Sequence, residues 1–318
     1  MDNVSFVAHP FRFNIVVEHA RTAAAWINKA RLAENLGYAT FLVPDHTWVE
    51  VDPAIGLMAA ASSTSRLRVG SHVFCNDFRN PVLLAKQAAT LDLFSGGRFQ
   101  LGLGCGYFQG DYLHTGIPFE PVGTRISRLE EAIRVIKRYL SDDTLTFSGQ
   151  HYQVQGMATR PKPVQEQLPL YMGGASKRVL SLAGREADIV GLGAKFVGPA
   201  AFAFDLRSTL PAANHEKIEW IRAAAGERFE QLEFSTTVFK AVITASNAQR
   251  DAVSQRMAEQ FRVSPEDILN SMNVLVGSSA QIIDKLQEQR ALFGISCIEI
   301  LEGDMESFAP VVAALAGK

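Results

Sequence analysis

The chain has 318 residues, 47% of them hydrophobic and 20% charged, and its formal net charge is −2. This composition is ordinary for a globular protein. A chain of this length can bury a large core without a stabilising disulfide or metal ion. Near-neutral charge supplies no basic field for nucleic acid or an acidic membrane, and three scattered cysteines argue against a disulfide framework and a zinc site.

The N-terminus lacks a basic segment followed by an apolar run, and no apolar stretch approaches the roughly 18 residues of a membrane span. We therefore expect a cytoplasmic protein with no membrane partner, no nucleic-acid partner and no metal.

The first half of the chain alternates short apolar runs with segments of helical length. The predicted elements are a strand over 11–17, a helix over 22–35, a strand over 40–43, a short helix from Asp52-Pro53, a strand over 67–74, a helix from Asn80-Pro81 to about residue 93, a strand over 98–103 and a helix over 124–140. Asp or Asn followed by Pro is typical of a helix start, since the side chain caps the helix and proline fits its first turn.

The second half continues the alternation more loosely. The predicted elements are a surface hairpin over 144–154, a strand over 170–172, a helix over 176–183, a strand over 188–192, an irregular excursion over 194–215, a helix over 218–229, a strand over 232–244, a helix over 249–261, a helix start at Ser264-Pro265-Glu266, a helix over 278–293, a strand over 296–301 and a helix over 308–316.

Eight strands that alternate with helices predict a parallel sheet with helical crossovers. An open doubly wound sheet is the competing fold. Eight units in one chain with no composition break favour closure, so we predict a single (β/α)8 TIM barrel with insertions, one domain over 1–318. Such barrels carry their chemistry on the loops that follow the strands.

Two predicted strands end in residues suited to chemistry. Asp45 and His46 follow the second strand, where His46 suits proton transfer, although a capped loop with a half-exposed histidine would look the same. The third strand carries His72, for which an inward polar residue is the alternative, and Cys75, which more often packs as a small hydrophobe than it acts as a nucleophile.

Two glycine-rich turns follow the fourth and fifth strands. Residues 102–107 (GLGCGY) lack the glycine spacing of a dinucleotide fingerprint, but they would let the backbone approach a flat ligand. Gly173-Gly174-Ala175-Ser176 leads into a helix whose free amides, with Lys177, could bind an anion, although an ordinary capped helix would look similar.

Together these segments resemble the luciferase-like family of flavin- and deazaflavin-dependent oxidoreductases, over nearly the whole chain. The motifs that carry the resemblance are AENLGYATFLVPDH (33–46), STSRLRVGSHVF (63–74), NPVLLAKQAATLDLFSGGRFQLGLGCGY (80–107), RLEEAIRVIKRYL (128–140) and YMGGASKRVLSLAGREADIVGL (171–192). Within the family, the chain most resembles an actinobacterial group that uses coenzyme F420.

The resemblance implies roles for named residues. It places the cofactor ring at the C-terminal mouth of a barrel and a non-proline cis peptide at His72-Val73. It makes His46 the catalytic residue. The implied cofactor-binding residues are Asp45, His72, Val73, Cys75, Cys105, Gly106, Tyr107, Gly173, Gly174, Ala175, Ser176 and Lys177. Dimerisation is common in the family, so a homodimer is expected.

One departure bears on the substrate. Sugar-phosphate dehydrogenases of the family carry a catalytic glutamate immediately after the glycine loop, where this chain has Tyr107, and an asparagine where it has Gly110. Sugar-6-phosphate oxidation is therefore not expected, and the acid–base work would fall to His46 alone.

Three functions remain open at this point. The leading one is an F420-dependent oxidoreductase that transfers a hydride to or from a small-molecule substrate. The alternatives are an FMN-dependent luciferase-like monooxygenase and a non-catalytic cofactor-binding protein on the same fold.

Overall fold

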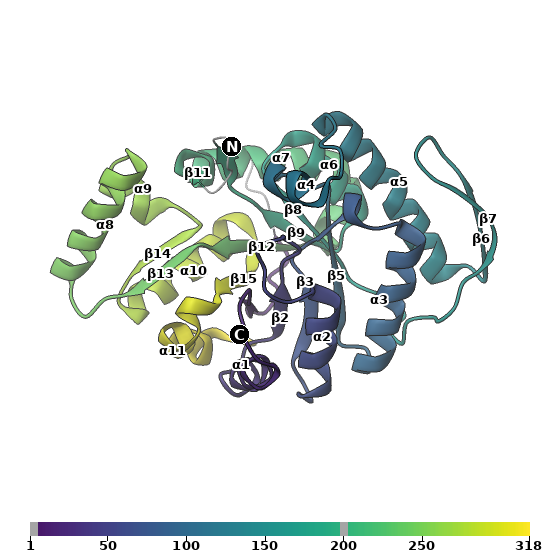
Figure 1. Ribbon diagram of the computed structural model, residues 1–318. Helices are drawn as coiled ribbons and strands as arrows, with labels where there is room; N and C mark the ends of the chain where they lie inside the picture. The colour runs from purple at the N-terminus through teal and green to yellow at the C-terminus, as the bar shows by residue number, and fades with distance from the viewer. Residues whose placement is uncertain (1–5, 198–202) are drawn as a thin grey trace. The chain divides into compact units, whose positions relative to one another are not determined.

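The computed structural model describes residues 6–197 and 203–318, and its main feature is a closed barrel of eight parallel strands with helices between them (Figure 1). The barrel strands are β1 (Arg12–Val16), β2 (Thr40–Val43), β3 (Arg68–Ser71), β5 (Phe99–Gly104), β8 (Leu170–Gly174), β9 (Ile189–Leu192), β12 (Glu233–Val238) and β15 (Ile295–Leu301). Their order in the sheet is β3-β2-β1-β15-β12-β9-β8-β5, and pairing of β3 with β5 closes it. The predicted (β/α)8 barrel is confirmed.

Helices connect these strands. They are α1 (Ala23–Asn35), α2 (Pro53–Ser62), α3 (Pro81–Ser95), α4 (Gln109–Thr115), α5 (Val122–Ser141), α6 (Lys177–Glu186), α7 (Pro211–Ala225), α8 (Asn247–Phe261), α9 (Pro265–Asn270), α10 (Ser279–Phe293) and α11 (Met305–Leu315). The side chains of Asp52 and Asn80 accept bonds from the first-turn amides of α2 and α3, so both predicted Pro-containing helix starts are confirmed.

The chain falls into two compact units. The first unit comprises the described residues up to Val16, Leu32–Thr40 and Gly173–Lys318. In it, Phe13 of β1 packs on Phe308 of α11 with ring centroids 6.0 Å apart. Strand β1 pairs with β15, and β15 pairs with β12. Most side chains of these three strands are buried, as expected of parallel strands that are covered on both faces.

The second unit comprises Val17–Arg31 and Phe41–Met172. Trp26 of α1 meets Phe41 of β2 edge to face, and its indole N–H donates to the carbonyl of Gly56 in α2 at 2.8 Å. The predicted hairpin is confirmed as β6 (Thr144–Ser148) and β7 (Gln153–Ala158), which lie beside α5 (Figure 1).

The third predicted strand is interrupted. The structure divides 67–74 into β3 and a two-residue strand, β4 (Phe74–Cys75), which pairs with the end of β5. The break lies at His72-Val73, whose peptide bond is cis as the resemblance implied.

Three predictions in the later part of the chain need correction. The excursion over 194–215 is more regular than predicted, with an antiparallel pair, β10 (Lys195–Val197) and β11 (Ala203–Asp205), while residues 198–202 lie outside the described part. Helix α7 begins at Pro211 rather than at 218, because Pro211 suits the first turn of a helix. The single strand over 232–244 is two strands, β12 and β13 (Lys240–Ile243).

Strand β13 leaves the barrel because it has a different partner. It pairs with β14 (Val274–Gly277), a strand that the sequence pattern did not reveal. Helices α8 and α9 pack beside this pair, and the small core that they share contains buried Val253, Ile268 and Val274 (Figure 1).

Candidate functional site

Asp45 anchors the end of β2 to the end of β4. The guanidinium of Arg79 binds both carboxylate oxygens, with Nη2 2.8 Å from Oδ1, and the amide of Cys75 donates to Oδ2 at 2.9 Å. A bidentate ion pair of this kind fixes the orientation of both side chains. Asp45 is therefore engaged by the protein itself, and a direct cofactor contact by this residue stays a prediction.

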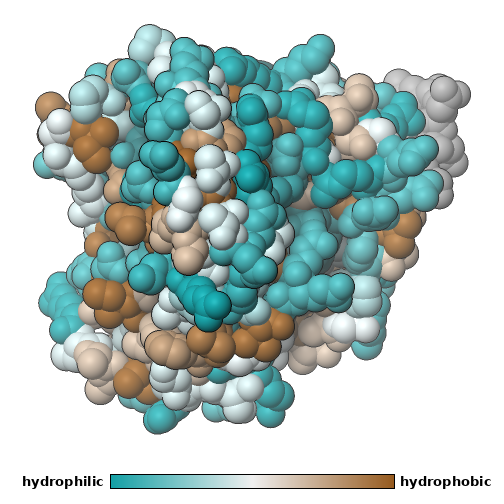
Figure 2. All heavy atoms as spheres, turned by 90° about the vertical axis from the view of Figure 1, so that its right-hand side faces the viewer, coloured by the Kyte–Doolittle hydropathy of each residue, from teal (hydrophilic) through white to brown (hydrophobic). Residues whose placement is uncertain are grey.

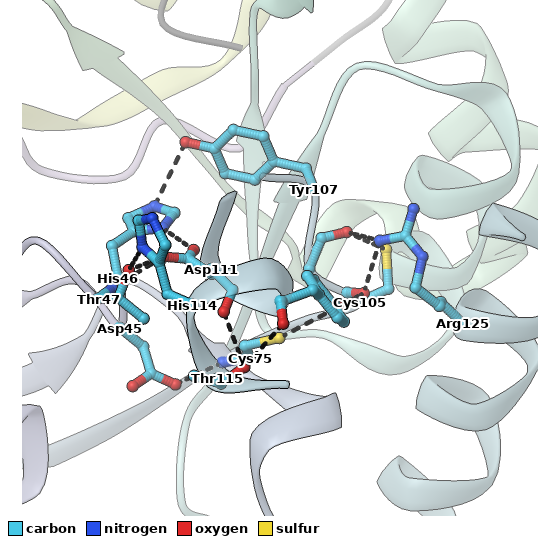
Figure 3. Close-up of polar contacts among 12 residues, drawn as sticks. Asp45, His46, Thr47, Cys75, Cys105, Tyr107, Asp111, His114, Thr115 and Arg125 are labelled. Carbon is cyan, nitrogen blue, oxygen red and sulfur yellow. Dashed lines mark hydrogen bonds and ion pairs between the residues drawn. The ribbon is translucent and has the colours of Figure 1, made fainter. Parts of the chain in front are cut away.

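His46, the predicted catalytic residue, has a buried partner that the sequence analysis missed. Its Nδ1 lies 2.7 Å from Oδ2 of Asp111, a residue of α4 (Figure 3). The amide and the hydroxyl of Thr47 each donate to Oδ1 of Asp111 at 2.8 Å. Three donors therefore fix this carboxylate, so His46 has a hydrogen-bonded partner, and its acid–base role stays a prediction.

The ionisation of Asp111 follows from these contacts. Burial on its own would raise the pKa of Asp111, but the bonds from His46 and Thr47 outweigh it and lower this pKa below its ordinary range. Asp111 is consequently a carboxylate that accepts a hydrogen bond, which favours a proton on Nδ1 of His46 and leaves Nε2 for other work.

Aromatic rings surround the other side of His46. Its imidazole stacks on Trp48 with centroids 3.8 Å apart, and Phe108 meets Trp48 edge to face. The hydroxyl of Tyr107 lies 3.3 Å from Nε2 of His46 (Figure 3). The site thus combines one proton-carrying imidazole with a largely apolar surround.

The glycine loop after β5 is tightly held. The buried guanidinium of Arg125 donates to the carbonyls of Cys105, at 3.3 Å, and Gly106 (Figure 3). Gly106 has φ +73°, and a β-carbon there would lie 2.0 Å from the hydroxyl of Tyr112 and 2.9 Å from the sulfur of Cys75. Only glycine satisfies both the backbone conformation and the packing.

Cys75 is a packing residue rather than a nucleophile. The side chain is buried, its sulfur lies 3.6 Å from the hydroxyl of Tyr112, and desolvation raises the pKa of the thiol to about 12. The nucleophilic form of cysteine is the thiolate, which this environment disfavours. Cofactor contact by Cys75 remains a prediction.

Val73 packs into a gap that two glycines leave open. A β-carbon on Gly102 would lie 3.0 Å from Val73 and 2.0 Å from the carbonyl of Ser71, and one on Gly104 would lie 2.8 Å from Val73. The neighbouring His72 ring lies 5.1 Å from the ring of Tyr171. The end of β5 is therefore shaped to receive the His72-Val73 turn.

The predicted anion site belongs to the first unit. Gly193 donates to the carbonyl of Gly174 at 2.9 Å, and a β-carbon on Gly193 would lie 3.0 Å from the Gly174 backbone. Ala175 leads to Ser176, the N-cap of α6, whose side chain makes no capping bond, and Ser176 and Lys177 are exposed. A helix start with an uncommitted hydroxyl and an adjacent cation suits an anion.

Two observations test whether the chain suits a flat, phosphorylated cofactor. The side chain of Ser176 leaves the first-turn amides of α6 uncapped, as a phosphate site requires. Asn76, directly after Cys75, is fully buried, yet its Oδ1 has no hydrogen-bond partner within 6–197 and 203–318. A buried acceptor without a partner, next to the predicted position of the cofactor ring, fits a ligand that carries hydrogen-bond donors.

Across the described ranges, no three His, Cys, Asp or Glu side chains gather as a metal site, and no helix is long and apolar enough to cross a membrane.

Comparison with known proteins identifies the family. The luciferase-like monooxygenase family matches residues 5–296. The chain belongs to this family. A solved structure, the F420-dependent tetrahydromethanopterin reductase of Methanopyrus kandleri, has the same fold, with a TM-score of 0.77 and 18% identity over 96% of this chain and 100% of that one.

Curated relatives of both cofactor types match part of the chain. An uncharacterized protein of Mycobacterium tuberculosis is 30% identical over 50% of this chain and 64% of its own length. The F420-dependent glucose-6-phosphate dehydrogenase of Kineococcus radiotolerans is 32% identical over 49% and 48%. The FMNH2-dependent dimethylsulfone monooxygenase of Pseudomonas putida is 33% identical over 41% and 36%. The matches thus span between about one third and two thirds of these relatives.

Proposed function

We propose that this protein is an F420-dependent oxidoreductase that transfers a hydride between the deazaflavin and a small organic substrate. The observation that carries the proposal is the pair formed by His46 and the buried carboxylate of Asp111, 2.7 Å apart. Such a pair can hold and move a proton beside a reacting group. The F420-dependent relative from Kineococcus supports the choice of cofactor.

Each unit, taken by itself, contains residues that suit part of such a cofactor. In the second unit the backbone at His72-Val73 and the glycine loop at Cys105-Gly106 suit a flat ring. In the first unit the Gly173–Lys177 turn suits an anion such as a phosphate. When bound, the deazaflavin would supply or accept the hydride. The protein would supply orientation through the fixed loop and a proton through His46.

An FMN-dependent monooxygenase is the second candidate, favoured by the match to the Pseudomonas monooxygenase. Fluorescence titration of the purified protein with F420 and with FMN separates the two. We expect F420 to bind in the micromolar range or tighter. FMN binding without F420 binding would overturn the proposal in favour of the second candidate, and oxygen uptake with reduced FMN would then test it.

A non-catalytic cofactor-binding protein is the third candidate. Under it, His46→Ala would leave every measured turnover unchanged. Under the proposed function, the same substitution lowers turnover by about 10²-fold or more. It leaves the F420 dissociation constant within about twofold, because the phosphate and the loop contacts remain.

We also propose that the protein is a homodimer that packs through α2 and α3. These two helices pack on each other in the second unit, and their outward faces carry Ile55, Leu83 and Phe94, exposed by 72, 65 and 67%. Figure 2, which faces the side of the β6–β7 hairpin in Figure 1, shows hydrophobic side chains dispersed among hydrophilic ones. A second copy would remove these large apolar side chains from water.

A further inference from the structure

The hydroxyl of Tyr107 ends a chain of four polar groups. Thr47 fixes Asp111, Asp111 accepts from Nδ1 of His46, and the Tyr107 hydroxyl lies 3.3 Å from Nε2 of the same ring. Asp111 is buried, whereas Tyr107 is 44% exposed. The chain therefore leads from a buried carboxylate to a phenol that a substrate can reach.

The charges around Tyr107 favour its neutral form. Desolvation of the partly buried phenol, followed by the negative charges of Asp111 and Glu18, raises the pKa of Tyr107 to about 12. Tyr107 is thus a hydrogen-bond donor at neutral pH. The same two carboxylates would repel a negatively charged substrate group placed against this hydroxyl.

The remaining surround is apolar. Trp48 stacks on one face of the His46 ring, and Phe108 and Tyr107 meet the same ring edge to face, with centroids 6.2 and 5.4 Å away. Apolar surroundings of this kind suit an uncharged substrate with one polar group directed at the Tyr107 hydroxyl.

We propose that Tyr107 is the catalytic residue that exchanges a proton with the substrate oxygen. His46 exchanges this proton with Tyr107, and Asp111 is a positioning residue for His46. The substrate is a small uncharged carbonyl compound or the corresponding alcohol. The inference rests on the proposed function, because the hydride must come from a cofactor.

In the reducing direction the carbonyl carbon would accept a hydride, that is one proton and two electrons, which a bound reduced deazaflavin would supply. The carbonyl oxygen takes the proton of the Tyr107 hydroxyl. The oxygen of Tyr107 then takes a proton from Nε2 of His46, which this nitrogen has gained from solvent beforehand, so that His46 returns to the neutral imidazole with its proton on Nδ1. Alcohol oxidation is the reverse.

The first test needs neither cofactor nor substrate. Nitrogen NMR of histidine-labelled protein, with the His46 signals assigned from His46→Gln, reports which ring nitrogen carries the proton. We expect the Nδ1–H form in the wild type, a mixed or reversed tautomer in Asp111→Asn, and a changed Nε2 signal in Tyr107→Phe. His46 signals unaffected by both substitutions would overturn the relay.

The second test measures turnover with chosen probes. Reoxidation of reduced F420 is followed with acetone, cyclohexanone, benzaldehyde and 4-carboxybenzaldehyde. We expect at least one neutral carbonyl to be reduced, and kcat/KM for benzaldehyde to exceed that for its carboxylate analogue by about tenfold or more. F420 binding without reduction of any neutral carbonyl would overturn the substrate class.

Variants then separate a catalytic role from a structural one. Tyr107→Phe keeps the ring and removes only the hydroxyl, so kcat should fall by about 10²-fold while F420 binding stays within twofold. Tyr139→Phe, which removes a distant hydroxyl bonded to the carbonyl of Arg160, is the matched control and should keep wild-type kcat. Tyr107→Phe with more than half of wild-type kcat would overturn the proposal.

The proposed function and this inference fail in different ways. If F420 does not bind to the wild type, the proposed function fails, whereas the tautomer measurement still decides whether Asp111 and Tyr107 control His46.

Discussion

Gly106 is a residue whose substitution should be costly for two separable reasons. Its φ of +73° disfavours any side chain, and a β-carbon would meet Tyr112, whose hydroxyl is held by the carboxylate of Asp77 at 3.0 Å. We expect Gly106→Ala to lower the free energy of unfolding by about 1 kcal/mol for the backbone and by about 1–3 kcal/mol more for the clash. Urea denaturation measures the sum.

Gly116 offers the matched control for this prediction. Its φ of +71° is nearly the same, but a β-carbon there would meet nothing within 4 Å. Gly116→Ala should therefore show the backbone cost alone. Equal losses in the two variants would contradict the account of a crowded glycine loop.

Single residues differed in how well the sequence could predict them. His46 and Gly106 were found because they follow strands, where a barrel collects its functional groups. Asp111 was missed because it is 65 positions from His46 in the sequence, although its Oδ2 lies only 2.7 Å from Nδ1 of His46 in space. It lies on the seven-residue helix α4, which is too short for its periodicity to stand out.

The β6–β7 hairpin depends on one side chain of α5. The carboxylate of Glu131 accepts from the amides of Gln150, His151 and Tyr152 at 2.8, 2.8 and 3.3 Å. We expect Glu131→Ala to lower the free energy of unfolding by roughly 1–2 kcal/mol, because these amides lose a charged acceptor. Amide hydrogen exchange should accelerate most at residues 149–152.

Glu130 is the control on the same helix. It makes a surface ion pair with Arg134 at 3.9 Å, an arrangement that contributes roughly 0.3–0.5 kcal/mol. Glu130→Ala should leave exchange in the hairpin unchanged. If both variants behave alike, Glu131 does not anchor the hairpin.

Elements were predictable where their pattern was local. Cap residues and helical periodicity placed α2, α3 and α5 within a few positions. The division of 232–244 into β12 and β13 could not be read in this way, because a strand ends where its partner changes: β12 pairs with β9 and β15, but β13 pairs with β14. The partner of β13 lies 34 positions away in the sequence, so the local hydrophobic pattern does not reveal where β13 begins.

At the scale of the whole molecule, the repeated alternation of strands and helices predicted the fold more reliably than any single element did. Strand 67–74 and strand 232–244 were each wrong in detail, yet the count of eight barrel strands was correct. Closure tolerates such errors because it depends on the number of βα units. The oligomeric state has no comparable signal, since it depends on which apolar side chains remain exposed after folding.

The proposed dimer gives the prediction at this scale. Light scattering after size exclusion should give a mass of twice 34.8 kDa for the wild type. Leu83→Glu should give the mass of one chain, because an unpaired carboxylate on the outward face of α3 would have to be buried in the interface. Leu113→Glu is the control on α4, where Leu113 is 79% exposed against 65% for Leu83, and it should leave the dimer intact. A wild type with the mass of one chain would contradict the dimer, and dissociation by Leu113→Glu but not by Leu83→Glu would move the interface away from α2 and α3.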